Sequence, residues 1–313
     1  MRNTVIMAVY NGQKYLQEQL DSIRLQTQQP DEVIFGDDGS KDNSVKVIEE
    51  YIEKYNLKGK WKVIVNEKNL GYANNFNSLL NLASGDYVFL ADQDDIWELD
   101  KIQIMSNFLD ITPDCELLCC DYKPYFMENV QGKAPSDVVA RMNNNGLVEK
   151  NNWSANSAYL RTLGCCMCVR KSFIKEVKAY WYDNWAQDDR LWRLAQCKNG
   201  CYTIHKELIR HRIHGSNACT YQKYHTRKER LARFQDMQLA NQKMLEYAQS
   251  LKDLQKVSDI KNHILVMNLR LELLAQHKFL NALKLIAYTR FYEKKKSYLV
   301  DIYFSVIWML HGE

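Results

Sequence analysis

The run YVFLADQDDIW, residues 87–97, places acidic side chains directly after an apolar segment. Asp92, Asp94 and Asp95 offer hard carboxylate oxygens, which bind Mg²⁺ or Mn²⁺ and leave coordination positions for water and substrate phosphates. The same acids suit the N-cap and first turn of the helix expected after them. An EF-hand is excluded, because its sixth position would be Trp97 instead of Gly. These residues alone fit two interpretations: a metal site that binds a nucleotide diphosphate, or a capped, solvated turn.

A second acidic pair, Asp37 and Asp38, also ends an apolar run and is followed by Gly39-Ser40 and a helical pattern. Backbone amides at a helix N-terminus favour anionic or polar ligand groups. A carboxylate there can accept hydrogen bonds from a base N–H or from ribose hydroxyls, although a simple turn and cap explains the pair equally well.

The elements that must position these acids alternate between short strands and amphipathic helices, a pattern typical of βαβ units and a mainly parallel sheet. The expected strands are 4–10, 32–37, 62–67 and 87–92, with helices over 15–26 and 42–55. Polar loops follow several of these strands. In an open α/β sheet, ligands bind outside the carboxyl ends of the strands. We therefore expect the loops to meet at one edge of the sheet.

Further along, strand character is predicted for 116–125, 164–173 and 201–217, and a helix for 185–200. From about residue 220 the pattern is helical, with apolar positions at heptad-like spacing. We predict a catalytic domain over 1–220 and a helical C-terminal region over 221–313. The latter holds 16 Lys and Arg against 9 Asp and Glu, in a chain whose net charge is +4.

The composition narrows the class of protein. Nine cysteines lie mostly within apolar runs, which favours a reduced, cytoplasmic setting. We expect no signal peptide and no transmembrane helix. The basic C-terminal region carries no known nucleic-acid-binding motif, so we expect no nucleic-acid partner. Its basic–aromatic stretch 290–310 suits peripheral contact with the inner face of the cell membrane, or packing on the catalytic domain or in a homodimer.

Several motifs together resemble the inverting family 2 glycosyltransferases of the GT-A fold: VYNGQKYLQEQLDSIRLQT, DDGSKDNS, NLGYANNFNSLL and ASGDYVFLADQDDIW. Their order and spacing match over roughly residues 3–105. The form DQDDIW resembles the rhamnosyltransferases of bacterial surface polysaccharide synthesis. The resemblance implies an α/β fold of GT-A type, with a Rossmann-like, mainly parallel sheet flanked by helices, and here with a helical C-terminal appendage.

The resemblance also implies roles for particular residues. Asp37 and Asp38 would recognise the base and ribose, in a nucleoside pocket lined by Val9, Tyr10 and Asn11. Asp92 and Asp94 match the DXD motif, with Asp94 as the direct ligand of Mg²⁺ or Mn²⁺.

Three later residues complete the implied site. Asp188 in AQDDRLW would be the general base; its spacing to Leu191 matches the family, whereas Gln187 departs from the usual Glu or His. Arg212 would neutralise phosphate charge, and His214 would complete the metal shell.

The function implied is metal-dependent, inverting transfer of a sugar from a nucleotide-sugar donor to a hydroxyl of a bacterial surface glycan, with a lipid-linked acceptor. The subgroup favours L-rhamnose from dTDP-L-rhamnose. A UDP-hexose or UDP-N-acetylhexosamine donor stays open, as does an inactive nucleotide-binding subunit of an assembly complex.

Overall fold

The computed structural model describes residues 1–127, 142–214 and 226–311. The chain divides into two compact units. The first comprises residues 1–151, 161–195 and 199–217, and the second comprises 152–160, 196–198 and 218–313. Two short segments that precede residue 218 therefore belong with the C-terminal helices.

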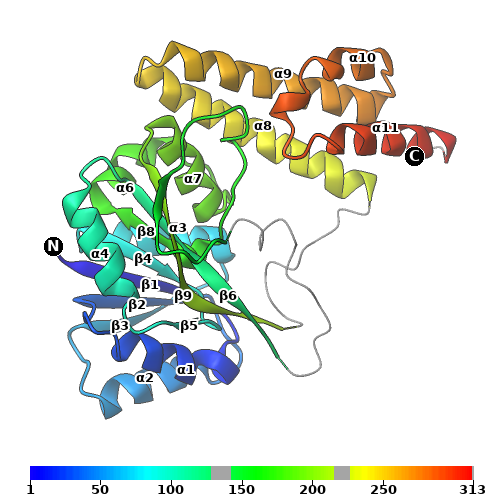
Figure 1. Cartoon of the computed structure of the whole chain (residues 1–313). Helices are drawn as coiled ribbons and strands as arrows, with labels where there is room; N and C mark the ends of the chain where they lie inside the picture. The colour runs from blue at the N-terminus through cyan, green and yellow to red at the C-terminus, as the bar shows by residue number, and fades with distance from the viewer. Residues whose placement is uncertain (128–141, 215–225, 312–313) are drawn as a thin grey trace. The chain divides into compact units, whose positions relative to one another are not determined.

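The first unit contains one mixed sheet (Figure 1). Its strands run in the order β3-β2-β1-β4-β8-β6-β9-β5, and β7 pairs with β9. The pairs β1–β2, β1–β4, β2–β3 and β6–β9 are parallel, whereas β8, β5 and β7 pair antiparallel to their neighbours. The strands are β1 (Asn3–Val9), β2 (Glu32–Asp37), β3 (Trp61–Val65), β4 (Tyr87–Ala91), β5 (Ile96–Trp97), β6 (Leu117–Phe126), β7 (Val148–Lys150), β8 (Met167–Arg170) and β9 (Cys201–Ile213).

Helices cover the sheet because the central strands are apolar toward both faces, as buried parallel strands usually are. Val5 and Met7 of β1 share a core cluster with Leu16 and Leu20 of α1, and α1 packs beside α2. On β2, Gly36 allows α3 to approach closely, since a Cβ there would lie 2.5 Å from Asn75 Oδ1. The helices of this unit are α1 (Gln13–Arg24), α2 (Ser44–Lys54), α3 (Tyr72–Leu82), α4 (Lys101–Ile111), α6 (Lys171–Val177) and α7 (Gln187–Cys197), with 3₁₀ turns η1 (Gly164–Cys166) and η2 (Lys178–Tyr180).

The second unit is helical (Figure 1). Thr226 and Glu229 form a capping box at the start of its first helix, which fixes where that helix begins. The elements are α8 (Arg227–Ser250), α9 (Leu254–Gln276), α10 (Leu280–Ile286), η3 (Thr289–Phe291) and α11 (Ser297–Leu310). Helices α8, α10 and α11 each pack on α9. Within the described ranges, no helix has the length and apolarity needed to cross a bilayer.

These observations confirm the predicted fold class, a mainly parallel α/β sheet flanked by helices and followed by a helical region. The strand predicted over 164–173 was wrong in extent. Only β8 within it is extended, η1 precedes it and α6 begins at Lys171. Short apolar runs fit strands and buried helices equally well, so periodicity could not separate the three pieces. The eight cysteines in the described ranges are buried and free of disulfides.

Candidate functional site

Hydrogen bonds join the loops that follow β1, β2 and β4. The side chain of Gln93 accepts from the amide of Tyr10 at 2.9 Å and donates to the Tyr10 carbonyl at 3.0 Å. Asn11 N–H donates to Ser40 Oγ at 2.9 Å, and Asn11 Oδ1 accepts from the Lys41 amide at 2.7 Å. The predicted convergence of polar loops at the carboxyl edge of the sheet is therefore present between these three loops.

The acidic pair after β2 is buried and largely engaged. Asp38 accepts from the amides of Leu70 and Gly71 at 2.8 and 2.9 Å, which holds the loop before α3. Asp37 Oδ2 accepts from the amides of Gly39 and Ser40, while its Oδ1 has no hydrogen-bond partner among the described residues. An unsatisfied buried carboxylate oxygen is unfavourable unless a ligand or water serves it.

The loop after β4 pairs with the end of β9. Asp95, fully buried, accepts from His211 Nδ1 at 2.8 Å and from the Arg212 amide at 3.1 Å. Burial disfavours the charged imidazole, but the hydrogen bond and the charges of Asp95 and Asp92 outweigh it and raise the pKa of His211 to about 9. His211 is therefore an imidazolium at neutral pH, and the pair fixes the acidic loop to β9.

Asp94, the residue before Asp95, contacts His214, three residues after His211. Their Oδ2 and Nε2 atoms lie 2.8 Å apart, and the His214 ring stacks on Tyr15 of α1 with centroids at 4.5 Å. Asp92 is partly exposed beside them. Desolvation, followed by repulsion from Asp95 and Asp94, raises the pKa of Asp92 well above its ordinary value. Three carboxylates are thus gathered where their mutual repulsion is large.

Asp92, Asp94 and His214 offer donor types that suit a hard divalent cation, although their ligand atoms do not all lie within 4.8 Å of one another in this structure. Carboxylates of Asp92 and Asp94 and the imidazole of His214 are suitable donors, and a cation would relieve the repulsion that raises the Asp92 pKa. A second group, Asp95, Cys165 and His211, brings its ligand atoms within 4.8 Å of one another. There the raised pKa of His211 and its contact with Asp95 favour an ion pair. His214 is likewise in contact with Asp94 at 2.8 Å, so a cation bound by these two residues would have to replace that contact.

The two acids at the start of α7 have different surroundings. Asp189 Oδ2 accepts from Trp185 Nε1 at 2.8 Å and from Arg193 Nε at 2.7 Å. Asp188 Oδ1 accepts from the amide of Asp189 at 2.8 Å. Burial, followed by the charge of Asp189, raises the pKa of Asp188 to about 6. Asp188 thus binds a proton more tightly than an ordinary Asp, and its charge is close enough to raise the Asp92 pKa.

Arg212 is buried between the acidic loop and α1. Its Nε donates to the Asp94 carbonyl at 2.8 Å and its Nη2 pairs with Glu18 at 2.6 Å. The guanidinium also lies over the rings of Tyr15 and Tyr125. In this arrangement Arg212 orients the loop that carries Asp94, and any phosphate contact would compete with Glu18.

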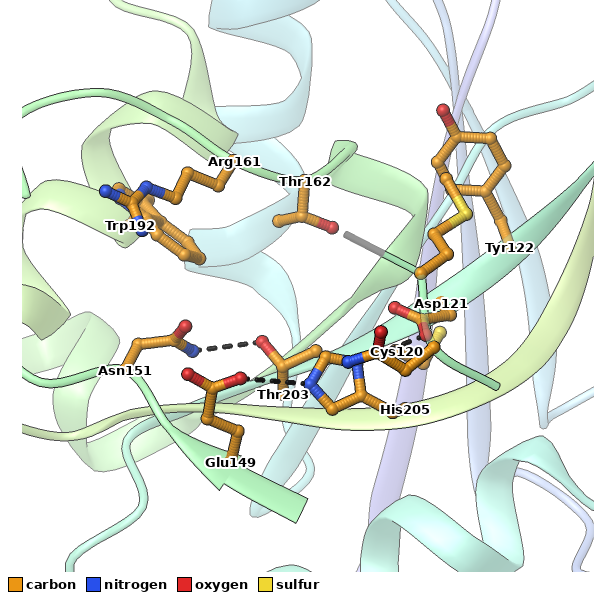
Figure 2. A pocket seen from close by; sticks show the side chains of 12 residues that line it. Cys120, Asp121, Tyr122, Glu149, Asn151, Arg161, Thr162, Trp192, Thr203 and His205 are labelled. Atoms are coloured by element: carbon orange, nitrogen blue, oxygen red, sulfur yellow. Dashed lines mark hydrogen bonds and ion pairs between the residues drawn. The ribbon is translucent and has the colours of Figure 1, made fainter. Parts of the chain in front are cut away.

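A pocket of about 280 Å³ opens beside α7 (Figure 2). On one side His205 is held between Asp121 at 3.2 Å and Glu149 at 3.1 Å. Arg161 and Trp192 lie together across the pocket from it in Figure 2. Trp192 of α7, which lines the pocket, is one helical turn beyond Asp188.

The structure places the predicted residues in three groups. Asp94, Arg212 and His214 are in contact, with Asp92 close to Asp94. Asp37 ends β2, Tyr10, Asn11 and Asp38 lie in the loops after β1 and β2, and Asp188 is in the first turn of α7. Val9 is buried in the core, and its carbonyl accepts from the Asp38 amide. Sequence reasoning gave no role to Gln93, Tyr15 or His211. Gln93 was visible inside the acidic motif, but its partner lies 83 residues away.

Comparisons with known proteins agree with this geometry. Residues 4–177 match the model of glycosyl transferase family 2. An uncharacterized glycosyltransferase of Haemophilus influenzae is 28% identical over 231 residues, covering 68% of this chain and 66% of that protein. An uncharacterized Mycobacterium tuberculosis protein is 33% identical over 113 residues, 36% of this chain, and the match spans 32% of that relative's length.

Solved structures of TarS from S. aureus share the fold. TarS 1–349 in complex with UDP-GlcNAc has a TM-score of 0.63 at 19% identity, covering 100% of this chain and 93% of that one. The complex with UDP has a TM-score of 0.61 at 21% identity, covering 91% and 75%. The family match extends over more than half of the chain and includes the loops that carry Asp38, Asp94 and Gln93, so this chain belongs to glycosyl transferase family 2.

Proposed function

We propose that this protein transfers a sugar from a nucleotide-sugar donor to a hydroxyl of a bacterial surface glycan, with inversion at the anomeric carbon. The observation that carries the proposal is that Asp188, whose pKa is raised to about 6, lies close enough to the acidic cluster around Asp94 for its charge to raise the pKa of Asp92. Inverting transfer needs a base for the acceptor proton and a separate site for the leaving diphosphate. Asp188 would supply the base, and the acidic cluster would supply the site for the leaving diphosphate.

In this proposal Asp188 accepts the proton of the acceptor hydroxyl as that oxygen attacks the anomeric carbon. A carboxylate with a pKa near 6 is mostly ionised at neutral pH and is still a better proton acceptor than an unperturbed Asp. Asp189 accepts hydrogen bonds from Trp185 and Arg193, so in this proposal it stabilises the start of α7 and does not take the acceptor proton.

Asp92, Asp94 and His214 would hold Mg²⁺ or Mn²⁺, which when bound supplies positive charge to the leaving diphosphate. Tyr15 fixes the His214 ring by stacking, and Arg212 fixes the Asp94 backbone. Asp95 and His211 tie the loop to β9, so the ligands are placed before the donor arrives.

The donor we propose is a pyrimidine nucleoside diphosphate sugar. The TarS structures, one in complex with UDP and another with UDP-GlcNAc, support a UDP-sugar. The DQDDIW motif supports dTDP-L-rhamnose. Asp37 Oδ1, buried without a partner among the described residues, suits a hydrogen bond from the base once the loop adjusts.

The acceptor sugar would occupy the pocket beside α7. Glu149, His205 and Asn151 offer hydrogen-bonding groups of the kind that read hydroxyls, and Trp192 contributes an aromatic surface (Figure 2). Trp192 lies one helical turn from Asp188, and we propose that a sugar in the pocket presents its hydroxyl toward that base.

Thermal-shift titration with UDP-GlcNAc and dTDP-L-rhamnose, each with and without Mn²⁺, tests the proposal. We expect one donor to raise Tm only with Mn²⁺, and Asp94→Asn to abolish the metal-dependent part. Asp110→Asn, in α4 and outside the site, is the matched control. If neither donor shifts Tm in the wild type, the donor assignment fails; if Asp94→Asn responds normally, the metal assignment fails.

A further inference from the structure

Helix α11 buries two polar residues beside Trp308 and presents apolar residues to solvent. Asp301, Ser305 and Trp308 are buried, whereas Leu299 and Leu310 are 64% and 70% exposed and Tyr303 is 60% exposed. At about 100° per residue, Leu299, Tyr303 and Leu310 lie within about 40° of one another, and the buried residues lie on the opposite side. Apolar residues of α11 therefore lie both in the packed core of the unit and on its exposed side, where an ordinary surface helix carries polar residues.

Helix α10 repeats the pattern. Its buried residues include Asn281, whose amide donates to Glu272 at 2.8 Å, together with Leu285. Leu280, Leu283 and Ile286 point away from them and are 73%, 66% and 55% exposed. Consecutive helices of one unit therefore both present apolar residues outward.

Hydrogen bonds from buried polar residues fix the orientation of α11 against α9. Asp301 is fully buried and accepts from Arg270 Nε at 2.7 Å, while the Arg270 guanidinium lies against the rings of Phe234 and Tyr292. Ser305 donates to the Leu273 carbonyl at 2.7 Å. Because these polar contacts fix which side of α11 faces α9, the helix cannot rotate to bury its leucines without breaking them.

The charges nearby indicate what covers this surface. From Lys278 to His311 the chain carries six Lys and Arg but only two acids, and one of the acids, Asp301, is buried in its ion pair. Lys295 and Lys296 are exposed directly before α11. Protein–protein interface cores are depleted in Lys, whereas apolar residues flanked by Lys and Arg are typical of helices that lie on anionic bilayers.

We propose that α10 and α11 bind the surface of an anionic lipid bilayer, with Leu280, Leu283, Ile286, Leu299, Tyr303 and Leu310 entering the interface. Helix α11 has 14 residues, fewer than the roughly 20 needed to span a hydrocarbon core, so contact is peripheral. The inference goes beyond the proposed sugar transfer and is independent of it. If both hold, the membrane contact brings the enzyme to lipid-linked acceptors.

Co-sedimentation of the full chain with phosphatidylcholine vesicles containing about 30% phosphatidylglycerol, and with phosphatidylcholine alone, tests this proposal. We expect binding to the anionic vesicles that weakens as salt is raised. Leu283→Glu/Leu299→Glu should lower the partition coefficient at least about tenfold, because two buried leucines and two repelling charges are involved. Lys295→Gln/Lys296→Gln should weaken binding by roughly tenfold, on anionic vesicles only.

The matched control is Leu25→Glu/Ile111→Glu, which replaces residues 51% and 80% exposed in the first unit and should bind as the wild type does. Circular dichroism checks the fold of every variant, and the thermal shift with UDP-GlcNAc reports donor binding separately from vesicle binding. Absence of wild-type binding to anionic vesicles would overturn the proposal, as would equal binding by Leu283→Glu/Leu299→Glu. Light scattering that shows a dimer dissociated by these substitutions, with no vesicle binding, would instead assign the surface to a second copy of this chain.

Discussion

At the scale of single residues, Asp188 and Asp189 show how two adjacent carboxylates acquire different roles. Asp189 has a ring N–H and a guanidinium as partners, whereas Asp188 is buried beside its neighbour's charge. The sequence showed that two acids, Asp188 and Asp189, are adjacent at the start of a predicted helix. Which of the two is engaged depends on Trp185 and Arg193 reaching the same oxygen, and that requires the helix geometry.

The first prediction concerns proton transfer by Asp188. Asp188→Asn should lower kcat by about 10²- to 10⁴-fold, the usual contribution of a general base. Wild-type kcat/KM should rise with pH through about 6, where Asp188 loses its proton, and then level off. Release of the nucleoside diphosphate from the donor, followed from pH 5 to 8, measures both.

The control for that prediction is Asp189→Asn. It leaves the buried Arg193 without its carboxylate, so it should lower the free energy of unfolding by about 1–3 kcal/mol. Its kcat should change less than tenfold. A larger loss of kcat in Asp189→Asn than in Asp188→Asn would reverse the assignment of the base.

A second prediction follows from the same pKa. Since folding raises the pKa of Asp188 from 3.8 to about 6, the folded state binds this proton more tightly than the unfolded state. The ionised carboxylate therefore destabilises the fold above pH 6, and the effect fades as the pH falls from about 6 to 4. Asp188→Asn should raise the free energy of unfolding by about 1–3 kcal/mol at pH 8 and by little at pH 4. Urea unfolding at the two pH values measures this; an equal gain at both would contradict it.

At the scale of elements, the sequence identified most strands of the sheet but not how their loops are joined. β-branched runs predicted β1 to β4, and the rule for open α/β sheets predicted that their polar loops converge. β5 has two residues and β7 has three, so neither leaves a periodic signal. The Asp95–His211 contact joins residues 116 apart, and no local pattern encodes it.

Gln93 is the element-scale contact most open to test. Because it bonds to both backbone groups of Tyr10, Gln93→Ala should loosen the loop after β1 and weaken donor binding about tenfold, near 1.4 kcal/mol. Tm should move by only about 2 °C, since the bonds are near the surface. Isothermal titration with the donor that stabilises the wild type gives Kd. Asn81→Ala, which removes one exposed side-chain bond to a backbone carbonyl in α3, is the matched control.

A double-mutant cycle sharpens this test. A Cβ at Gly12 would lie 2.2 Å from Gln93 Oε1, so Gly12→Ala should displace the Gln93 side chain and weaken donor binding by itself. In the Gln93→Ala background there is no such clash, and Gly12→Ala should then add little. Additive effects on the binding free energy would mean that Gln93 does not organise the loop.

At the scale of the whole molecule, the chain separates a polar site from an apolar, basic surface. The acidic cluster belongs to the first unit and the exposed leucines of α10 and α11 belong to the second. The uneven charge along the sequence predicted different surroundings for the two regions. It could not show that Asp301 faces inward and Leu299 outward, because α11 reads as an apolar stretch until its packing on α9 is known.

The buried ion pair of the second unit provides the last prediction. Asp301→Asn leaves the buried Arg270 without its counterion, so it should lower the free energy of unfolding of this unit by about 3–5 kcal/mol. Arg270→Met/Asp301→Leu removes this pair and should recover part of the loss, because apolar residues then fill the site, while Arg230, 3.6 Å from Asp301, still loses its carboxylate. Calorimetry with and without the donor should show that Asp301→Asn lowers a transition that the donor does not shift, while the donor-sensitive transition stays in place. If Asp301→Asn instead lowers the donor-sensitive transition by the same amount, the two units unfold as one, and the division seen in the packing does not extend to stability.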